Sequence, residues 1–280
     1  MKAYLIVFLG AGRAALMQLA HPYVAHAIDQ HSATRTDPLG RFNRTFLNVY
    51  GMIFGDLDFA MAAARRVRRV HDRIHGAIDE DVGRFARGHH DRAHDAEALY
   101  WVHATLLDTA IQVFEIGHGP LSSAERDEYV REVARFAWMF GIPDELIPTD
   151  WASFQAAMER VTDSDTIEVG RPARETARFL LSAPPSLVFG PAVRAYRSIT
   201  AGLLPPRLRE AFGLPWGRAD RLAYAASVAA VRASYRRLPL RLRVVPDYIE
   251  ATRRIQGKPA PDKAGRALQE ALLRHLRPPA

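Results

Sequence analysis

Cysteine is absent from the 280-residue chain, and lysine occurs only as Lys2, Lys258 and Lys263. Without thiols the protein has no disulfide, iron–sulfur cluster, thiolate-bound haem, cysteine zinc site or cysteine nucleophile. The scarcity of lysine excludes a Schiff-base lysine from the body of the chain. The longest apolar run, residues 3–12, ends at Arg13 and is shorter than the roughly 20 residues that cross a bilayer. We therefore expect a cytoplasmic protein without a transmembrane segment, and without a signal peptide because the helical pattern continues past this run.

The basic character of the chain comes almost wholly from arginine. Lys+Arg 38 against Asp+Glu 31 gives a formal net charge of +7. The arginines in residues 65–69 and 236–243 alternate with apolar residues at helical spacing, which is typical of solvated helix faces. No nucleic-acid recognition module is present, so we predict no nucleic-acid partner. A peripheral membrane contact through an arginine-rich face stays open.

Hydrophobic residues make up 48% of the chain and recur with the period of a helix, whereas strand-like alternation is nearly absent. We predict an all-α fold: a single multi-helix globular domain over residues 1–255 and a tail, residues 256–280, with one loosely attached helix at 262–276. The predicted helices of the domain cover residues 13–30, 38–54, 58–76, 95–116, 122–140, 151–161, 171–182, 192–203 and 220–235.

Histidine is concentrated in the first half of the chain, where all but one of the 11 histidines lie. His71 shares the apolar stripe of its predicted helix with Val67 and Ile74. His21 and His103 face inward in the same way elsewhere in the domain. Because a buried imidazole needs a partner for at least one nitrogen, His21 and His103 are either hydrogen-bonded core residues or ligands. For His71 we favour a ligand.

Two spacings predict metal binding by helices. His71 and His75 are four residues apart on one predicted helix, so the pair could hold one metal ion, although no H-E-x-x-H pattern accompanies it. Glu115 and His118 form E-x-x-H, and Asp72 and His75 form D-x-x-H, as in helical di-iron proteins. Glycines beside His118 weaken the first of these motifs.

Two arginines and a threonine form a further candidate site. Arg41, Arg44 and Thr45 lie within about one turn of a predicted helix, with Arg41 and Thr45 stacked at i,i+4. This group suits a dianionic ligand half inside the protein, such as the propionates of haem or a phosphate.

Six blocks occur in order along the first half of the chain: Leu19-Ala20-His21-Pro22-Tyr23-Val24-Ala25, Gln30-His31-Ser32, Pro38-x-x-Arg41-x-x-Arg44-Thr45, Phe54-Gly55-Asp56, Val70-His71-x-x-Ile74-x-Gly76 and Trp101-Val102-His103-Ala104-Thr105. Together with residues 202–206 and 210–216, they resemble the MpaB-like oxygenase family, which includes the latex-clearing proteins, the rubber oxygenases. The resemblance spans about residues 10–250, nearly the whole chain.

The resemblance implies an all-helical fold that binds haem b through a histidine and, in the rubber oxygenases, cleaves carbon–carbon double bonds with dioxygen. By motif match His71 is the proximal iron ligand, with His75 as the fallback. Arg41 and Thr45 match an arginine and a threonine of the family, and Arg44 stands where the rubber oxygenase has a lysine able to cap the iron. Arginine stays protonated, so it cannot take that role.

From this match we expect cofactor binding by His71, Arg41, His21, His31 and Thr45, and catalytic roles for Arg41, Arg44, Thr45 and His103. We predict a haem b-dependent oxygenase that uses O₂ on an apolar, unsaturated substrate of isoprenoid or lipid type. The alternatives are a non-catalytic haem-binding protein or sensor and a non-haem di-iron enzyme.

Overall fold

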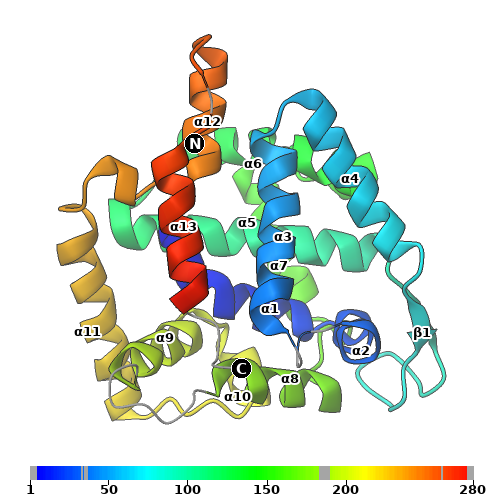
Figure 1. Cartoon of the computed structure of the whole chain (residues 1–280). Helices are drawn as coiled ribbons and strands as arrows, with labels where there is room; N and C mark the ends of the chain where they lie inside the picture. Colours follow the sequence, from blue (N-terminus) through cyan, green and yellow to red (C-terminus); the bar gives the residue numbers. More distant parts are fainter. Residues whose placement is uncertain (1–4, 33, 35–36, 183–189, 260, 276–280) are drawn as a thin grey trace.

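The computed structural model describes residues 5–32, 34, 37–182, 190–259 and 261–275, and it confirms the predicted all-α fold. Helices cross in several directions rather than forming a parallel bundle (Figure 1). The elements, with η for 3-10 helices, are η1 (Leu5–Gly10), α1 (Ala11–Leu19), α2 (Pro22–His31), α3 (Pro38–Phe54), α4 (Leu57–His71), β1 (His75–Ala77), β2 (His90–Arg92), α5 (Ala96–His118), α6 (Ser123–Phe140), η2 (Asp144–Leu146), α7 (Trp151–Thr162), α8 (Arg171–Leu181), α9 (Gly190–Leu203), α10 (Pro206–Ala211), α11 (Arg218–Tyr235), η3 (Leu240–Leu242), α12 (Pro246–Ile255) and α13 (Lys263–His275).

Helix α5 is the central element of the fold and runs behind α3 in Figure 1. It packs against η1, α1, α6 and α11. Trp101 of α5 is fully buried, and its indole N–H donates to the backbone oxygen of Met17 in α1 over 2.7 Å. A helix with buried residues on most of its faces is surrounded by others, so α5 provides a rigid base for the side chains that it carries.

A buried arginine joins helices α1, α5 and α9. Arg13 of α1 is 2% exposed and donates to the hydroxyl of Thr109 over 2.6 Å and to the backbone oxygen of Leu203 over 2.7 Å. Its guanidinium also forms an ion pair with Asp108. Burial lowers the pKa of Arg13, and the carboxylate of Asp108 opposes that effect. The ion pair therefore ties α1 to α5, and the bond to Leu203 adds α9.

Local signals account for several helix ends. Ser122 and Glu125 form a reciprocal capping box at the start of α6, where the sequence predicted a helix to begin. The same helix ends at Gly141, whose φ of 83° is left-handed, a conformation that suits glycine. Helix α3 begins at Pro38 and ends at Phe54, also as predicted.

Other predicted boundaries were wrong. The single helix predicted over 13–30 is two helices, because His21 is extended and Pro22 starts a new helix at its first position, where its missing N–H costs nothing. The helix predicted over 58–76 ends at His71, and the chain then forms the antiparallel pair β1–β2, in which His75 pairs with Arg92. The short helices α10 and α12 were not predicted.

The tail contains α13 within the predicted range. Its Arg266 pairs with Asp247 and Glu250 of α12 at 2.9 and 2.6 Å. The division into a domain of residues 1–255 and a tail stays a prediction. Among the residues described, no helix combines the length and apolar character needed to cross a bilayer.

Candidate functional site

His71 is the last residue of α4, where the chain leaves the helix. The helix starts at the cap Asp56, whose carboxylate accepts the backbone N–H of Phe59 over 2.8 Å. Ala63, Val67 and His71 follow at intervals of four residues and share one face, and Ala63 is fully buried. The helical spacing therefore turns His71 inward at the end of this face.

Aromatic rings surround the His71 imidazole. The ring centroids of Phe140 and His94 both lie 5.8 Å from it, each in an edge-to-face arrangement. The Nε2 of His94 lies 2.8 Å from a carboxylate oxygen of Asp72, so His94 bonds Asp72 and not His71. Within the described part of the chain, neither nitrogen of His71 has a hydrogen-bond partner.

Burial lowers the pKa of His71, and the neighbouring His94 lowers it further, against the opposing effect of Asp72. The imidazole is therefore neutral at pH 7. A neutral imidazole with a nitrogen that no protein group occupies is the form that binds iron.

His103 of α5 contacts α6 through an aromatic residue next to the one that borders His71. Its ring lies 5.5 Å from that of Phe136, and Phe136 lies 5.4 Å from Phe140, which borders His71. His103 is 5% exposed, and its buried Nδ1 has no hydrogen-bond partner. Burial lowers the pKa of His103 to about 4, so it is neutral too. Two unprotonated imidazoles thus flank one aromatic pair.

Arg41 and its neighbours lie near the start of α3. The Nε of Arg41 donates to the hydroxyl of Ser32 over 2.7 Å, and that hydroxyl also contacts Thr34 Oγ1 at 2.8 Å. No carboxylate lies within ion-pair distance of Arg41 in the described residues. Arg44, by contrast, is more than half exposed and pairs with Asp37 at 3.1 Å.

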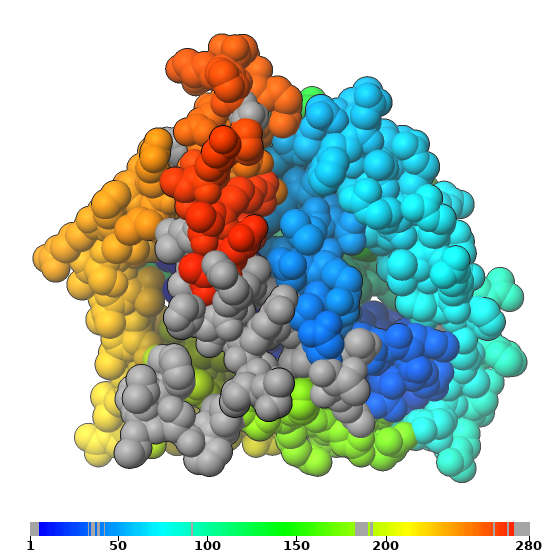
Figure 2. Space-filling model, viewed as in Figure 1, coloured from blue at the N-terminus to red at the C-terminus, as the bar shows by residue number. Residues whose placement is uncertain are grey.

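The other residues of this group lie nearby in the chain. Thr45 is exposed and donates its hydroxyl to the backbone oxygen of Arg41 over 3.0 Å. His31 is the exposed last residue of α2, directly before the Ser32 that bonds Arg41. The surface is hollowed between α3 and α4, above α2, and the end of α4 that carries His71 borders this hollow (Figure 2).

His21 is buried at the break between α1 and α2, as its apolar neighbours predicted. Its Nδ1 accepts the backbone N–H of Tyr23 over 3.2 Å and so caps α2. The Nε2 is buried without a partner, and burial lowers the pKa of His21 to about 3, with a smaller effect from Arg84. Its ring contacts Tyr23 and Phe85.

The metal sites predicted from helical spacing are not assembled among the described residues. His75 lies on the exposed β1, so it does not share a helical face with His71. Glu115 accepts from Arg126 at 2.6 Å near the end of α5. Asp72 bonds His94, just before the start of α5, so about 30 Å of helix separates the two di-iron motifs.

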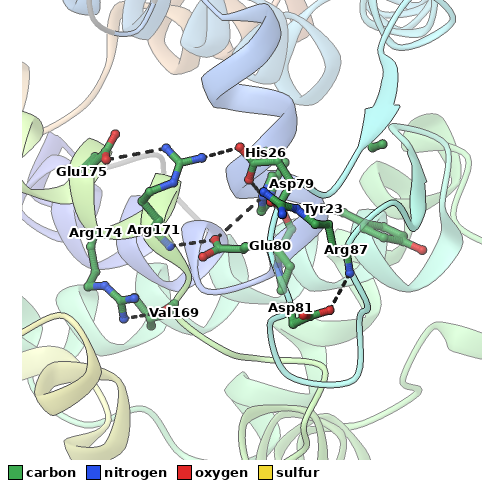
Figure 3. Close-up of polar contacts among 12 residues, drawn as sticks. Tyr23, His26, Asp79, Glu80, Asp81, Arg87, Val169, Arg171, Arg174 and Glu175 are labelled. Carbon is green, nitrogen blue, oxygen red and sulfur yellow. Dashed lines mark hydrogen bonds and ion pairs between the residues drawn. The ribbon is translucent and has the colours of Figure 1, made fainter.

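Sequence reasoning missed a second polar cluster, shown in Figure 3. His26, Asp79 and Glu80 bring one nitrogen and two carboxylate oxygens within 4.8 Å of one another. His26 lies on α2, whereas Asp79 and Glu80 lie in the segment after β1. His26 and Asp79 are 53 positions apart in the chain. No local spacing signals such a contact.

A protein-family model matches most of the chain, including the candidate residues described above. The family model described as "ER-bound oxygenase mpaB/B'/Rubber oxygenase, catalytic domain" matches residues 1–233. The chain belongs to this family. The match contains Arg41, His71 and His103, and it confirms the resemblance read from the sequence blocks. Membership of this oxygenase family supports an enzymatic, O₂-using role. Searches of curated proteins and of solved structures give no significant match.

Proposed function

We propose that the protein is a haem b-dependent oxygenase that acts with O₂ on an apolar, unsaturated substrate of isoprenoid or lipid type. The observation that carries this proposal is His71: a half-buried imidazole, kept neutral by burial, with no protein partner for either nitrogen in the described residues. Haem supplies the oxygen chemistry when it is bound, and the protein supplies position and electrostatics.

The residues around His71 fit a haem group. His71 would be the iron ligand through a ring nitrogen, since it is neutral and unoccupied. Arg41 would hold a propionate, because its guanidinium is largely enclosed and, among the described residues, donates only to a hydroxyl. Thr45 and His31 lie close to Arg41 in the chain and would border the same carboxylates.

Of the other predicted residues, His103 and Arg44 would act on the substrate side, and His21 would contact the cofactor. His103 presents an uncharged imidazole, and Phe136 and Phe140 would give an apolar wall beside the two histidines. His21 has a buried nitrogen open for a hydrogen bond. Arg44 stays protonated, so it would attract an anionic or polar group and cannot ligate iron.

The alternatives are tested by the same preparation. Protein expressed with a haem supply should show a Soret band and consume O₂ only when an unsaturated apolar substrate is added. A Soret band without substrate-dependent consumption of O₂ would favour a haem carrier or sensor. Bound iron without a Soret band would favour a non-haem enzyme, although the two di-iron motifs lie at opposite ends of α5.

A contact with an anionic bilayer is a second proposal, on a separate observation. Leu57, Met61, Arg65 and Arg68 follow one exposed face of α4, with Leu57 76% and Met61 41% exposed. Apolar side chains beside arginines match a surface of anionic lipid, from which an apolar substrate would be drawn.

Co-sedimentation with anionic and zwitterionic vesicles tests this contact. Binding should require anionic lipid and fall when Leu57 and Met61 are both replaced by serine. Leu222 of α11 is 62% exposed, so Leu222→Ser is a matched control that should keep full binding. Equal loss in both variants would exclude a specific role for α4.

A further inference from the structure

A cluster of ionisable side chains lies where α2, the segment after β1 and the start of α8 meet (Figure 3). The Nε2 of His26 lies 2.9 Å from Oδ1 of Asp79 and 3.8 Å from Oε1 of Glu80. The imidazole of His26 is nearly fully buried, whereas the side chain of Asp79 is 50% exposed. The site is thus anchored in the protein on one side and open to solvent on the other.

The hydrogen bonds of His26 require a cation. Its Nδ1 lies 2.9 Å from the backbone oxygen of Pro22, which can only accept, so Nδ1 carries a hydrogen. In a neutral ring Nε2 is then an acceptor, and it faces the carboxylate of Asp79, another acceptor. Two acceptors at 2.9 Å need a proton or a metal ion between them. A hydrogen bond from Nδ1 to a carbonyl is also the usual support of a metal-bound histidine.

The two carboxylates are held in place from the opposite side. The backbone N–H of Arg171 donates to Oε1 of Glu80 over 2.8 Å, and its guanidinium pairs with Oδ2 of Asp79. A Cβ on Gly170 would lie 2.3 Å from Oε1 of Glu80, so the carboxylate rests against backbone that only glycine allows. These contacts position both carboxylates without using every oxygen.

The charge of the cluster is not balanced by arginine. Asp79 and Glu80 bring two negative charges, and Arg171 divides its single positive charge between Asp79 and Glu175, which lies 3.6 Å from it. Arg87 donates to the backbone oxygen of Asp79 and to neither of the two carboxylates. Counted over the described residues, a net negative charge therefore remains beside the imidazole of His26.

We propose that His26, Asp79 and Glu80 form a binding site for a divalent cation of the Zn²⁺ class, separate from the haem site at His71. One imidazole nitrogen and two carboxylate oxygens are a ligand set that such ions take, with water completing the coordination. Two ligand atoms about 2.1 Å from one ion lie at most about 4.2 Å apart, and the distances of 2.9 and 3.8 Å from Nε2 of His26 to the two carboxylate oxygens fall within that limit. A bound ion would link α2, the segment after β1 and, through Arg171, α8.

The test is metal binding by the whole protein after chelator treatment, with Zn²⁺ alone as the ligand in calorimetry. We expect one equivalent to bind, with at least about tenfold weaker affinity in His26→Gln and in Asp79→Asn. His90→Gln is the matched control, because His90 is an exposed histidine of β2, outside the cluster, and it should leave affinity unchanged. Circular dichroism checks that each variant is folded.

Co²⁺ gives a second readout that does not depend on comparing stabilities. In the unsubstituted protein, Co²⁺ should give visible d–d bands that one equivalent of Zn²⁺ abolishes. Nitrogen NMR of His26 separates the two cations: a ring protonated on both nitrogens and unchanged by Zn²⁺ would show that a proton fills the position. That result, or Zn²⁺ binding in both cluster variants as tight as in the unsubstituted protein, would overturn the proposal.

Discussion

The ring of His71 at the end of α4 meets the ring of Phe140 at the end of α6, edge to face, with centroids 5.8 Å apart. This contact encloses one side of an imidazole that has no hydrogen-bond partner in the described residues. Burial lowers the pKa of His71, and His94 lowers it further. Phe136, which contacts Phe140 on the same helix, contacts the ring of His103.

Replacement of His71 tests the proposed iron ligand. His71→Ala should lose the Soret band of the haem-loaded protein, because its only proposed protein–iron bond is removed, and free imidazole should restore part of the band. His75→Ala is the control, since His75 lies exposed on β1, and it should keep the spectrum. A band lost only in His75→Ala would assign the ligand to the other imidazole.

Replacement of Arg41 tests the proposed propionate contact. Arg41→Leu should weaken haem retention about 10- to 100-fold, the effect of losing one charge-assisted hydrogen bond. Arg44→Leu should change it less than about fivefold, because Arg44 is solvent-exposed and already paired with Asp37. Haem transfer to apomyoglobin measures both. Equal losses in the two variants would contradict a specific role for Arg41.

The ion pair between Arg13 and Asp108 should dominate the stability of the α1–α5 contact. Arg13→Met leaves the Asp108 carboxylate, 16% exposed, without its ion-pair partner, and should lower the free energy of unfolding by about 3–5 kcal/mol in urea titrations. The exposed pair Arg84–Glu97 is the comparison, and Arg84→Met should cost about 1 kcal/mol or less. Similar losses of unfolding free energy in the two variants would mean that the Arg13–Asp108 ion pair stabilises the fold no more than an exposed pair does.

His103 should make stability depend on pH in the weakly acidic range. Its pKa falls from 6.5 to about 4 on folding, so between these values the unfolded chain binds more protons than the folded one. The free energy of unfolding therefore decreases as pH falls through this window, by on the order of 3 kcal/mol in all.

His103→Phe removes this group and should reduce the pH dependence of the urea midpoint between about pH 7 and about pH 5. The dependence should not vanish, because His21, whose pKa burial lowers to about 3, still contributes in this range. His90→Gln alters an exposed histidine instead and should leave the slope as it is. If the slopes of all three proteins coincide, His103 is not the group responsible.

Some features of the candidate site were predicted correctly from the sequence, and others were not. The inward positions of His21 and His103 followed from their apolar neighbours and are confirmed by their burial. The shared helical face of His71 and His75 was wrong, because the helix ends at His71 and a strand follows. The role of His71 as the iron ligand stays a prediction that rests on the family match and on its free nitrogens.

The sequence by itself determined what depends on neighbours within a few turns: the helical class, the bounds of α3, the capping box of Ser122 and Glu125, and the ordered blocks of the family. Tertiary structure alone decided which distant groups meet. Arg13 pairs with Asp108, 95 positions away in the chain, and His26 contacts Asp79, 53 positions away. Helical period and caps are set by local backbone geometry, whereas these contacts depend on how helices cross, which no spacing along the chain encodes.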